Sequence, residues 1–259
     1  MMFHTFHMVT KSPWPLTSSI SALSLTLGFV IYFNFNDKTL ILISFLILFL
    51  SSFQWWRDIS REASLQGNHT IFVIRGLKLG MLLFILSEVF FFLSFFWAFF
   101  HSMLAPSIEI GSNWPPKSIS PFNPFEVPLL NSTILISSGI SITWSHHLIM
   151  KGNYKNSLLS LAITIMLGIS FTFFQLFEYY QAQFSITDGI FGSTFFLTTG
   201  FHGIHVIIGT IFLITSFLRL KKSLMLQNHH FGFEASAWYW HFVDVVWLFL
   251  FTFMYWWIF

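Results

Sequence analysis

The sequence predicts an all-α membrane protein with seven transmembrane helices. Its residues are 55% hydrophobic and only 8% charged, whereas soluble domains carry about 25% charged residues. Seven apolar runs are long enough to cross a bilayer, and Lys and Arg concentrate on alternate connections between these runs. A bilayer can solvate the large apolar surface of such a chain, and its interfaces favour Trp and Tyr side chains.

The seven apolar runs are separated by polar connections that are mostly short. Because short connections place neighbouring helices antiparallel, we expect one helical bundle. The polar stretch 57–69 interrupts this bundle. It predicts a two-helix hairpin over residues 1–66 and a five-helix bundle over residues 67–259. We also expect a cleft between the two parts. The runs are 16–33, 40–56, 77–104, 127–150, 158–180, 190–218 and 235–259.

The distribution of positive charge predicts the orientation. With the N-terminus inside, ten cations fall on the inner side and only Lys38 and Lys117 fall outside, which is the asymmetry typical of membrane proteins. An odd number of crossings then places the C-terminus outside. The ten inner cations are Lys11, Arg57, Arg61, Arg75, Lys78, Lys151, Lys155, Arg219, Lys221 and Lys222.

Glu88 is an acidic residue in the middle of the third run. A helix rise of about 1.5 Å per residue, counted from Lys78, places Glu88 about 15 Å deep in a hydrocarbon core about 30 Å thick. An acid at the centre of a spanning helix costs about 3 kcal/mol. Glu88 is therefore predicted to be functional rather than incidental.

Two other acids lie in or near predicted helices. Glu178 is followed by Tyr179, Tyr180 and Gln181 at an outer helix end, so we expect it at the interface rather than buried. Asp244 lies deeper and is three residues from His241, a spacing that allows the two side chains to pair on one helix face. For Asp244 we favour the simpler explanation, a polar contact between helices.

The eleven histidines form no recognisable metal or haem motif. His202 and His205 share a helix face, but the sequence has no Cys, no HExxH motif and no helix with two widely spaced histidines. We therefore expect histidines that form hydrogen bonds between helices and no metal ligands. The absence of a long basic run also argues against a nucleic-acid partner.

Ordered motifs along nearly the whole sequence carry a family resemblance. The chain resembles mitochondrial cytochrome c oxidase subunit III. The motifs are HMV and SPWPL within residues 7–16, QWWRD at 54–58, SEVFF at 87–91, FWAFFH at 96–101, WPP at 114–116, EVPLLN at 126–131, GFHGIHV at 200–206, HHFGFE at 229–234 and WYWHFVD at 238–244.

The resemblance implies a core subunit of the respiratory haem-copper oxidase in the mitochondrial inner membrane that binds no cofactor itself. Haem and copper would belong to partner subunits, including the catalytic haem-bearing subunit I. The subunit would support electron transfer from cytochrome c to oxygen and coupled proton pumping, with structural phospholipids filling the cleft.

The resemblance also assigns roles to single residues. Glu88 matches the family's buried, carbodiimide-reactive acid. Trp56, His69 and Arg219 match positions expected to bind lipid. His202 and His205 become packing or oxygen-path residues.

Two other functions are compatible with a helical membrane bundle. An independent proton or ion carrier could use Glu88 as its proton-binding group, but carriers show repeated halves and broken helices with several polar groups, whereas Glu88 is nearly alone in a continuous run. A haem-binding electron-transfer bundle would need the histidine pairs that the sequence lacks. The sequence therefore favours an accessory oxidase subunit.

Overall fold

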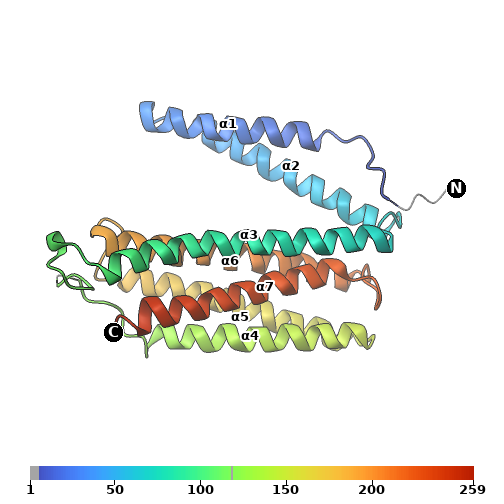
Figure 1. The fold of residues 1–259 in the computed structure, drawn as a ribbon. Coiled ribbons are helices and arrows are strands. Elements are labelled where there is room, and N and C mark those ends of the chain that lie inside the picture. The colour runs from blue at the N-terminus through green and yellow to red at the C-terminus, as the bar shows by residue number, and fades with distance from the viewer. Residues whose placement is uncertain (1–5, 118) are drawn as a thin grey trace. The chain divides into compact units, whose positions relative to one another are not determined.

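The computed structural model describes residues 6–117 and 119–259. Within them, seven helices are long and apolar enough to cross a membrane, which confirms the predicted fold class (Figure 1). Two short turns, the 3₁₀ turn η1 (Ile108–Ile110) and the π-helical turn η2 (Phe251–Trp256), complete the secondary structure. The helices are α1 (Trp14–Phe35), α2 (Thr39–Ser64), α3 (Ile71–Leu104), α4 (Val127–Met150), α5 (Tyr154–Gln181), α6 (Gly189–Lys221) and α7 (Phe231–Leu250).

Several helices are longer than the apolar runs that predicted them. The prediction of a polar linker over residues 57–69 was partly wrong, because α2 continues to Ser64 and α3 begins only at Ile71. An apolar run marks only the part of a helix that crosses hydrocarbon, and backbone hydrogen bonds continue the helix into the interface. By contrast, α4 has the predicted bounds.

The chain divides into two compact units between Leu77 and Lys78. In the first unit α1 and α2 pack against each other as a hairpin. Asn36 takes a left-handed conformation at the turn, with φ of 58°. The Asp37 carboxylate then accepts hydrogen bonds from the backbone N–H and the hydroxyl of Thr39, both at 2.9 Å. These bonds lower the pKa of Asp37 and define the start of α2.

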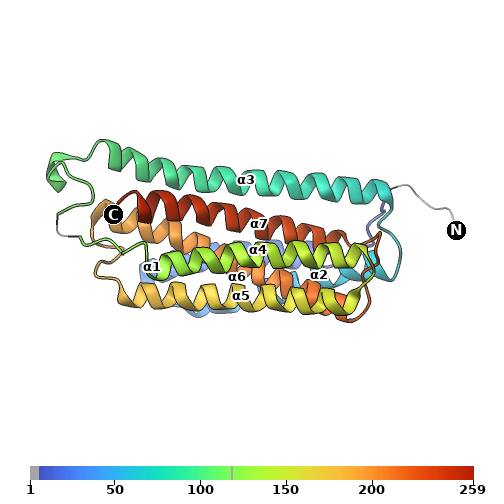
Figure 2. The ribbon, with the colours of Figure 1, turned by 90° about the horizontal axis from the view of Figure 1, so that it is seen from below.

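In the second unit α4, α5, α6 and α7 form a ring of neighbouring helices (Figure 2). Two fully buried tryptophans of α7, Trp240 and Trp247, lie at its centre. Their indole N–H groups donate to hydroxyls of α4, Trp240 to Ser138 at 2.8 Å and Trp247 to Ser132 at 3.0 Å. Each ring thus fills the core with apolar area while its one polar atom is satisfied.

Two glycines make room for Trp240. A Cβ atom on Gly168 of α5 would lie 2.6 Å from the Trp240 ring, and one on Gly209 of α6 would lie 2.9 Å from the same ring. Both separations are too short for a real side chain. The absence of a side chain at both positions therefore lets α5 and α6 approach α7 across the indole.

In this unit α3 contacts α6 and α7 through large aromatic side chains. Phe91 meets Phe201 of α6 with ring centroids 5.1 Å apart, and Phe92 meets Phe242 of α7 at 6.1 Å. Contacts through such large side chains hold the backbone of α3 away from its neighbours. This spacing leaves room for the pocket described below.

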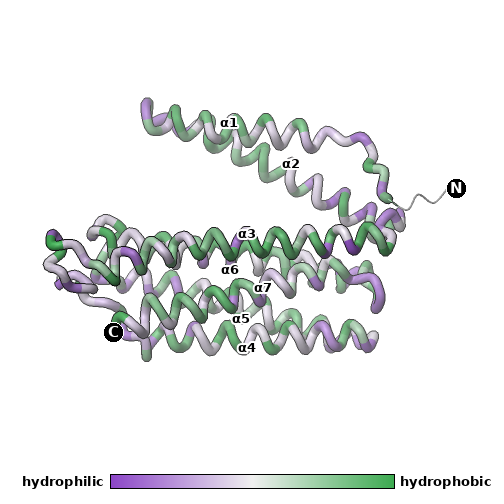
Figure 3. The backbone as a smooth tube through the Cα atoms, viewed as in Figure 1, coloured by the Kyte–Doolittle hydropathy of each residue, from purple (hydrophilic) through white to green (hydrophobic). Residues whose placement is uncertain are grey.

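Large apolar side chains are exposed on the outer faces of the helices. Met166 and Phe173 of α5 are 66% and 65% exposed, for example. Hydrophobic residues dominate the middle of the helices, and hydrophilic residues gather at their ends and connections (Figure 3). Exposed apolar surface of this extent is unfavourable in water and fits a lipid environment.

Candidate functional site

The central pair of the candidate site joins Glu88 of α3 to His205 of α6. Glu88 Oε2 lies 2.9 Å from His205 Nε2, and His205 Nδ1 lies 2.7 Å from the backbone oxygen of Phe201, one turn earlier in α6. The sequence did not indicate this pair, because 117 residues separate its members. The sequence had led us to expect Glu88 to be nearly alone, but the structure gives it a partner.

The backbone contact fixes one proton of this pair, the one on His205 Nδ1. A carbonyl oxygen only accepts, so Nδ1 of His205 carries hydrogen and donates to Phe201. The proton between Nε2 and Glu88 then has two positions. It sits on the carboxyl group, which donates to a neutral imidazole, or on Nε2, which donates to a carboxylate. The pair can thus exchange one proton without moving a heavy atom.

An apolar pocket of about 430 Å³ adjoins the pair. Glu88, His205 and Tyr239 are the polar residues of its lining, and the side chains of Glu88 and His205 are 22% and 10% exposed. Tyr239 stacks on the His205 ring at 6.2 Å, and Phe92 meets it edge-on at 5.0 Å. The remaining lining is mainly Met, Phe and Ile, including Met81, Phe84, Phe91, Phe201, Ile204, Ile208 and Phe212. A pocket with such a lining suits an apolar guest.

His202 has a different environment from His205, although only one helical turn separates them. Its Nε2 donates to the backbone oxygen of Val243 at 3.2 Å. Its ring lies between Phe171 and Trp247, with centroids 5.6 and 5.2 Å away, and the residue is 1% exposed. The geometry therefore places His202 in the packed core and His205 at the pocket.

Comparison with known proteins identifies the fold that carries this site. A family profile described as cytochrome c oxidase subunit III matches residues 4–259. The chain belongs to the cytochrome c oxidase subunit III family. The resemblance carried by the sequence motifs is thereby confirmed.

Individual relatives match the chain over nearly its whole length. The protein named cytochrome c oxidase subunit 3 from Rhipicephalus sanguineus is 73% identical over 257 residues, which cover 99% of this chain and 100% of that protein. The protein of the same name from Ornithorhynchus anatinus is 61% identical over 254 residues, or 98% of this chain and 97% of that protein. This family member is accordingly a multi-pass membrane subunit of a hetero-oligomeric oxidoreductase complex.

The three predicted lipid-binding residues of this subunit III chain lie in different units. Trp56, on α2 in the first unit, is 69% exposed, and His69 lies in the connection between α2 and α3. Arg219 lies in the last turns of α6 in the second unit. Its guanidinium group packs against Gly232 at the start of α7, where a Cβ atom would lie 2.7 Å from Nη1.

The expectation for Glu178 was wrong. This residue is 2% exposed, enclosed by α4, α5 and η2. Tyr255 of η2 donates to Glu178 Oε1 at 2.6 Å, and the Gln175 side-chain amide donates to the same oxygen at 3.5 Å. Asn131 of α4 extends the group by donating to Gln175 at 3.4 Å. Aromatic neighbours in the sequence indicated an interface, but packing from other helices covers the carboxyl group.

The structure pairs Asp244 with His241, as the spacing allowed. Asp244 Oδ2 lies 3.7 Å from His241 Nδ1 along one face of α7. The spacing revealed this contact because both residues belong to the same helix.

Proposed function

We propose that this chain is a cofactor-free subunit of mitochondrial cytochrome c oxidase in the inner mitochondrial membrane. Partner subunits, including the haem-bearing subunit I, carry electrons from cytochrome c to oxygen and pump protons. This chain stabilises the catalytic subunit and sustains proton uptake. Family membership along residues 4–259 supports the assignment to the complex. The Glu88–His205 hydrogen bond beside an apolar pocket is the observation that carries the proposed role within it.

In this proposal the pocket is part of an apolar path for oxygen, and the Glu88–His205 pair holds a proton beside that path. Oxygen is apolar and partitions into hydrocarbon, so a passage lined by Met, Phe and Ile side chains admits it. His202 belongs to the packing that holds α6 against α7. His205 positions Glu88 and shares its proton.

The proposed lipid role rests on charge and position. In this role phospholipid binds to the chain as a structural lipid. Trp56, His69 and Arg219 contact the lipid headgroups, since aromatic and cationic side chains are typical of headgroup contacts. The N-terminus faces the matrix and the C-terminus faces the opposite side, in agreement with the ten-to-two distribution of cations.

Purification from the native membrane tests the assignment to an accessory subunit. We expect the chain to copurify in mild detergent with other oxidase subunits and with a haem-copper signal in the reduced-minus-oxidised spectrum. Once the partners are stripped, the signal should leave with them. A chain that retains haem alone contradicts the proposal, and a chain that purifies alone without haem points to an independent carrier.

Turnover of a Glu88→Gln variant tests the role of the pocket. Gln keeps the size of Glu but does not exchange a proton, so we expect slower turnover at limiting oxygen. The exposed Glu109 provides the matched Glu109→Gln control, which should behave as the wild type. An unchanged apparent oxygen affinity in Glu88→Gln counts against the oxygen path.

A further inference from the structure

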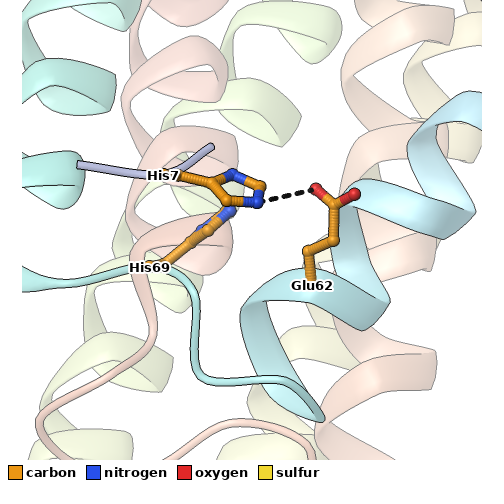
Figure 4. Close-up of side chains that lie close together, drawn as sticks. All are labelled: His7, Glu62 and His69. Carbon is orange, nitrogen blue, oxygen red and sulfur yellow. Dashed lines mark ion pairs between the residues drawn. The ribbon is translucent and has the colours of Figure 1, made fainter. Parts of the chain in front are cut away.

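Three side chains of the first unit meet at one place, although they come from separate segments. His7 precedes α1, Glu62 lies in the last turn of α2, and His69 lies in the connection to α3. One potential ligand atom from each residue lies within 4.8 Å of the others. His7 Nε2 is 4.0 Å from Glu62 Oε2, and the two imidazole rings are 6.0 Å apart between centroids (Figure 4).

The contact between His7 and Glu62 does not satisfy the His7 ring. A separation of 4.0 Å is too long for a hydrogen bond, and His7 Nε2 is a buried atom with no hydrogen-bond partner among the described residues. The side chains of His7 and Glu62 are only 12% and 14% exposed. A buried polar atom without a partner destabilises the folded chain. A bound ion between the three side chains would remove that destabilisation.

The three ligand types indicate which ion fits. Two imidazole nitrogens and one carboxylate oxygen form a ligand set that zinc takes in proteins, with its fourth position left to water or an anion. Ligand atoms about 2.1 Å from a tetrahedral zinc ion are about 3.4 Å apart. The observed 4.0 Å closes to that value by small side-chain rotations, since His7 and His69 both lie outside helices. Magnesium and calcium prefer oxygen ligands.

A second cluster of two histidines and one glutamate shows what distinguishes the first. His146, His230 and Glu234 also lie within 4.8 Å of one another. There, however, the Lys78 ammonium group lies 2.6 Å from Glu234 Oε2. A protein cation therefore already neutralises that carboxylate, whereas the closest recorded partner of Glu62 is the His7 imidazole.

We propose that His7, Glu62 and His69 bind one zinc ion, which fixes the segment before α1 to the end of α2 and to the end of the connection between α2 and α3. The ion gives His7 Nε2 a partner and joins three segments that the hairpin alone does not connect. Zinc uses one ring nitrogen of His69, so the proposed lipid contact of that residue would use the other nitrogen. The proposed zinc site does not depend on the role proposed above for the Glu88–His205 pair and its pocket.

Zinc content of the purified oxidase complex tests the site. The complex is treated with a chelator and reloaded with zinc, and the bound zinc is counted for the wild type and for His7→Gln and Glu62→Gln. We expect each variant to lose one zinc per chain and to bind it at least about 100-fold more weakly. His101→Gln, which changes an exposed histidine at the end of α3, should keep it. Equal zinc content and affinity in all four proteins overturns the proposal.

A measurement on the wild-type complex tests zinc binding at this site even where a variant fails to assemble. Diethylpyrocarbonate modifies histidine rings, and mass spectrometry reports the rate at each site. Zinc should slow modification of His7 and His69 but not of His101, and excess magnesium should not reproduce the effect. Unchanged rates at His7 and His69 overturn the proposal, as does protection by inorganic phosphate without zinc, which would indicate an anion site.

Discussion

Glu88 and Glu178 are acids of the same unit, and both lie in membrane-spanning helices, yet their environments differ. Glu178 is 2% exposed and receives hydrogen bonds from Tyr255 and Gln175. The Glu88 side chain is 22% exposed, adjoins an apolar pocket and, among the described residues, has His205 as its hydrogen-bond partner.

Under the proposed function, the difference separates a structural acid from an acid placed to exchange a proton. The Tyr255 hydroxyl donates to Glu178 Oε1 and so holds η2 against α5, while the Gln175 amide donates to the same oxygen from within α5. His205 can both give a proton to Glu88 and take one from it, at the edge of a pocket. Depth along a helix therefore does not reveal the role of a buried acid, whereas its partners do.

The largest effect is expected from Glu178→Ala. The substitution leaves the Tyr255 hydroxyl and the Gln175 amide without their shared acceptor and opens a cavity in a closed site, so we expect a loss of about 3 kcal/mol in stability. The temperature at which the chain dissociates from the purified complex, followed on native gels, should fall clearly. Glu109→Ala, at an exposed acid, is the control. An unchanged dissociation temperature would mean that the Glu178 cluster does not hold the fold.

A smaller effect is expected from Tyr255→Phe. Only the hydroxyl is lost, and with it the 2.6 Å bond donated to Glu178 and the 3.5 Å bond accepted from Gln175, so the expected loss of stability is about 1–2 kcal/mol. The matched control is Tyr239→Phe, because Tyr239 stacks on His205 and its hydroxyl has no recorded hydrogen bond within the described residues. The same dissociation assay should separate the two variants. Equal shifts would show that ring packing, rather than the hydroxyl, stabilises both sites.

The residues of these two sites show what the sequence could predict. The helices followed from apolar runs, and the Asp244–His241 contact followed from spacing, because both depend on local sequence. The Glu88–His205 bond joins positions 117 residues apart, and the His7–Glu62–His69 cluster forms only when the hairpin reverses the chain. Glu178 was predicted wrongly because sequence position along a helix does not show which neighbouring helix covers it.

The smallest effect on stability is expected from Glu88→Gln. The Gln amide can donate to Nε2 of His205, as a protonated Glu88 does, while Nδ1 still donates to Phe201. One hydrogen bond is therefore kept, the apolar pocket is unchanged, and the loss should stay below about 1 kcal/mol. Turnover at limiting oxygen is nevertheless expected to fall, so the two assays should separate in this variant alone. If Glu88→Gln instead dissociates from the complex as readily as Glu178→Ala, Glu88 is also a structural acid, and the contrast between the two sites does not hold.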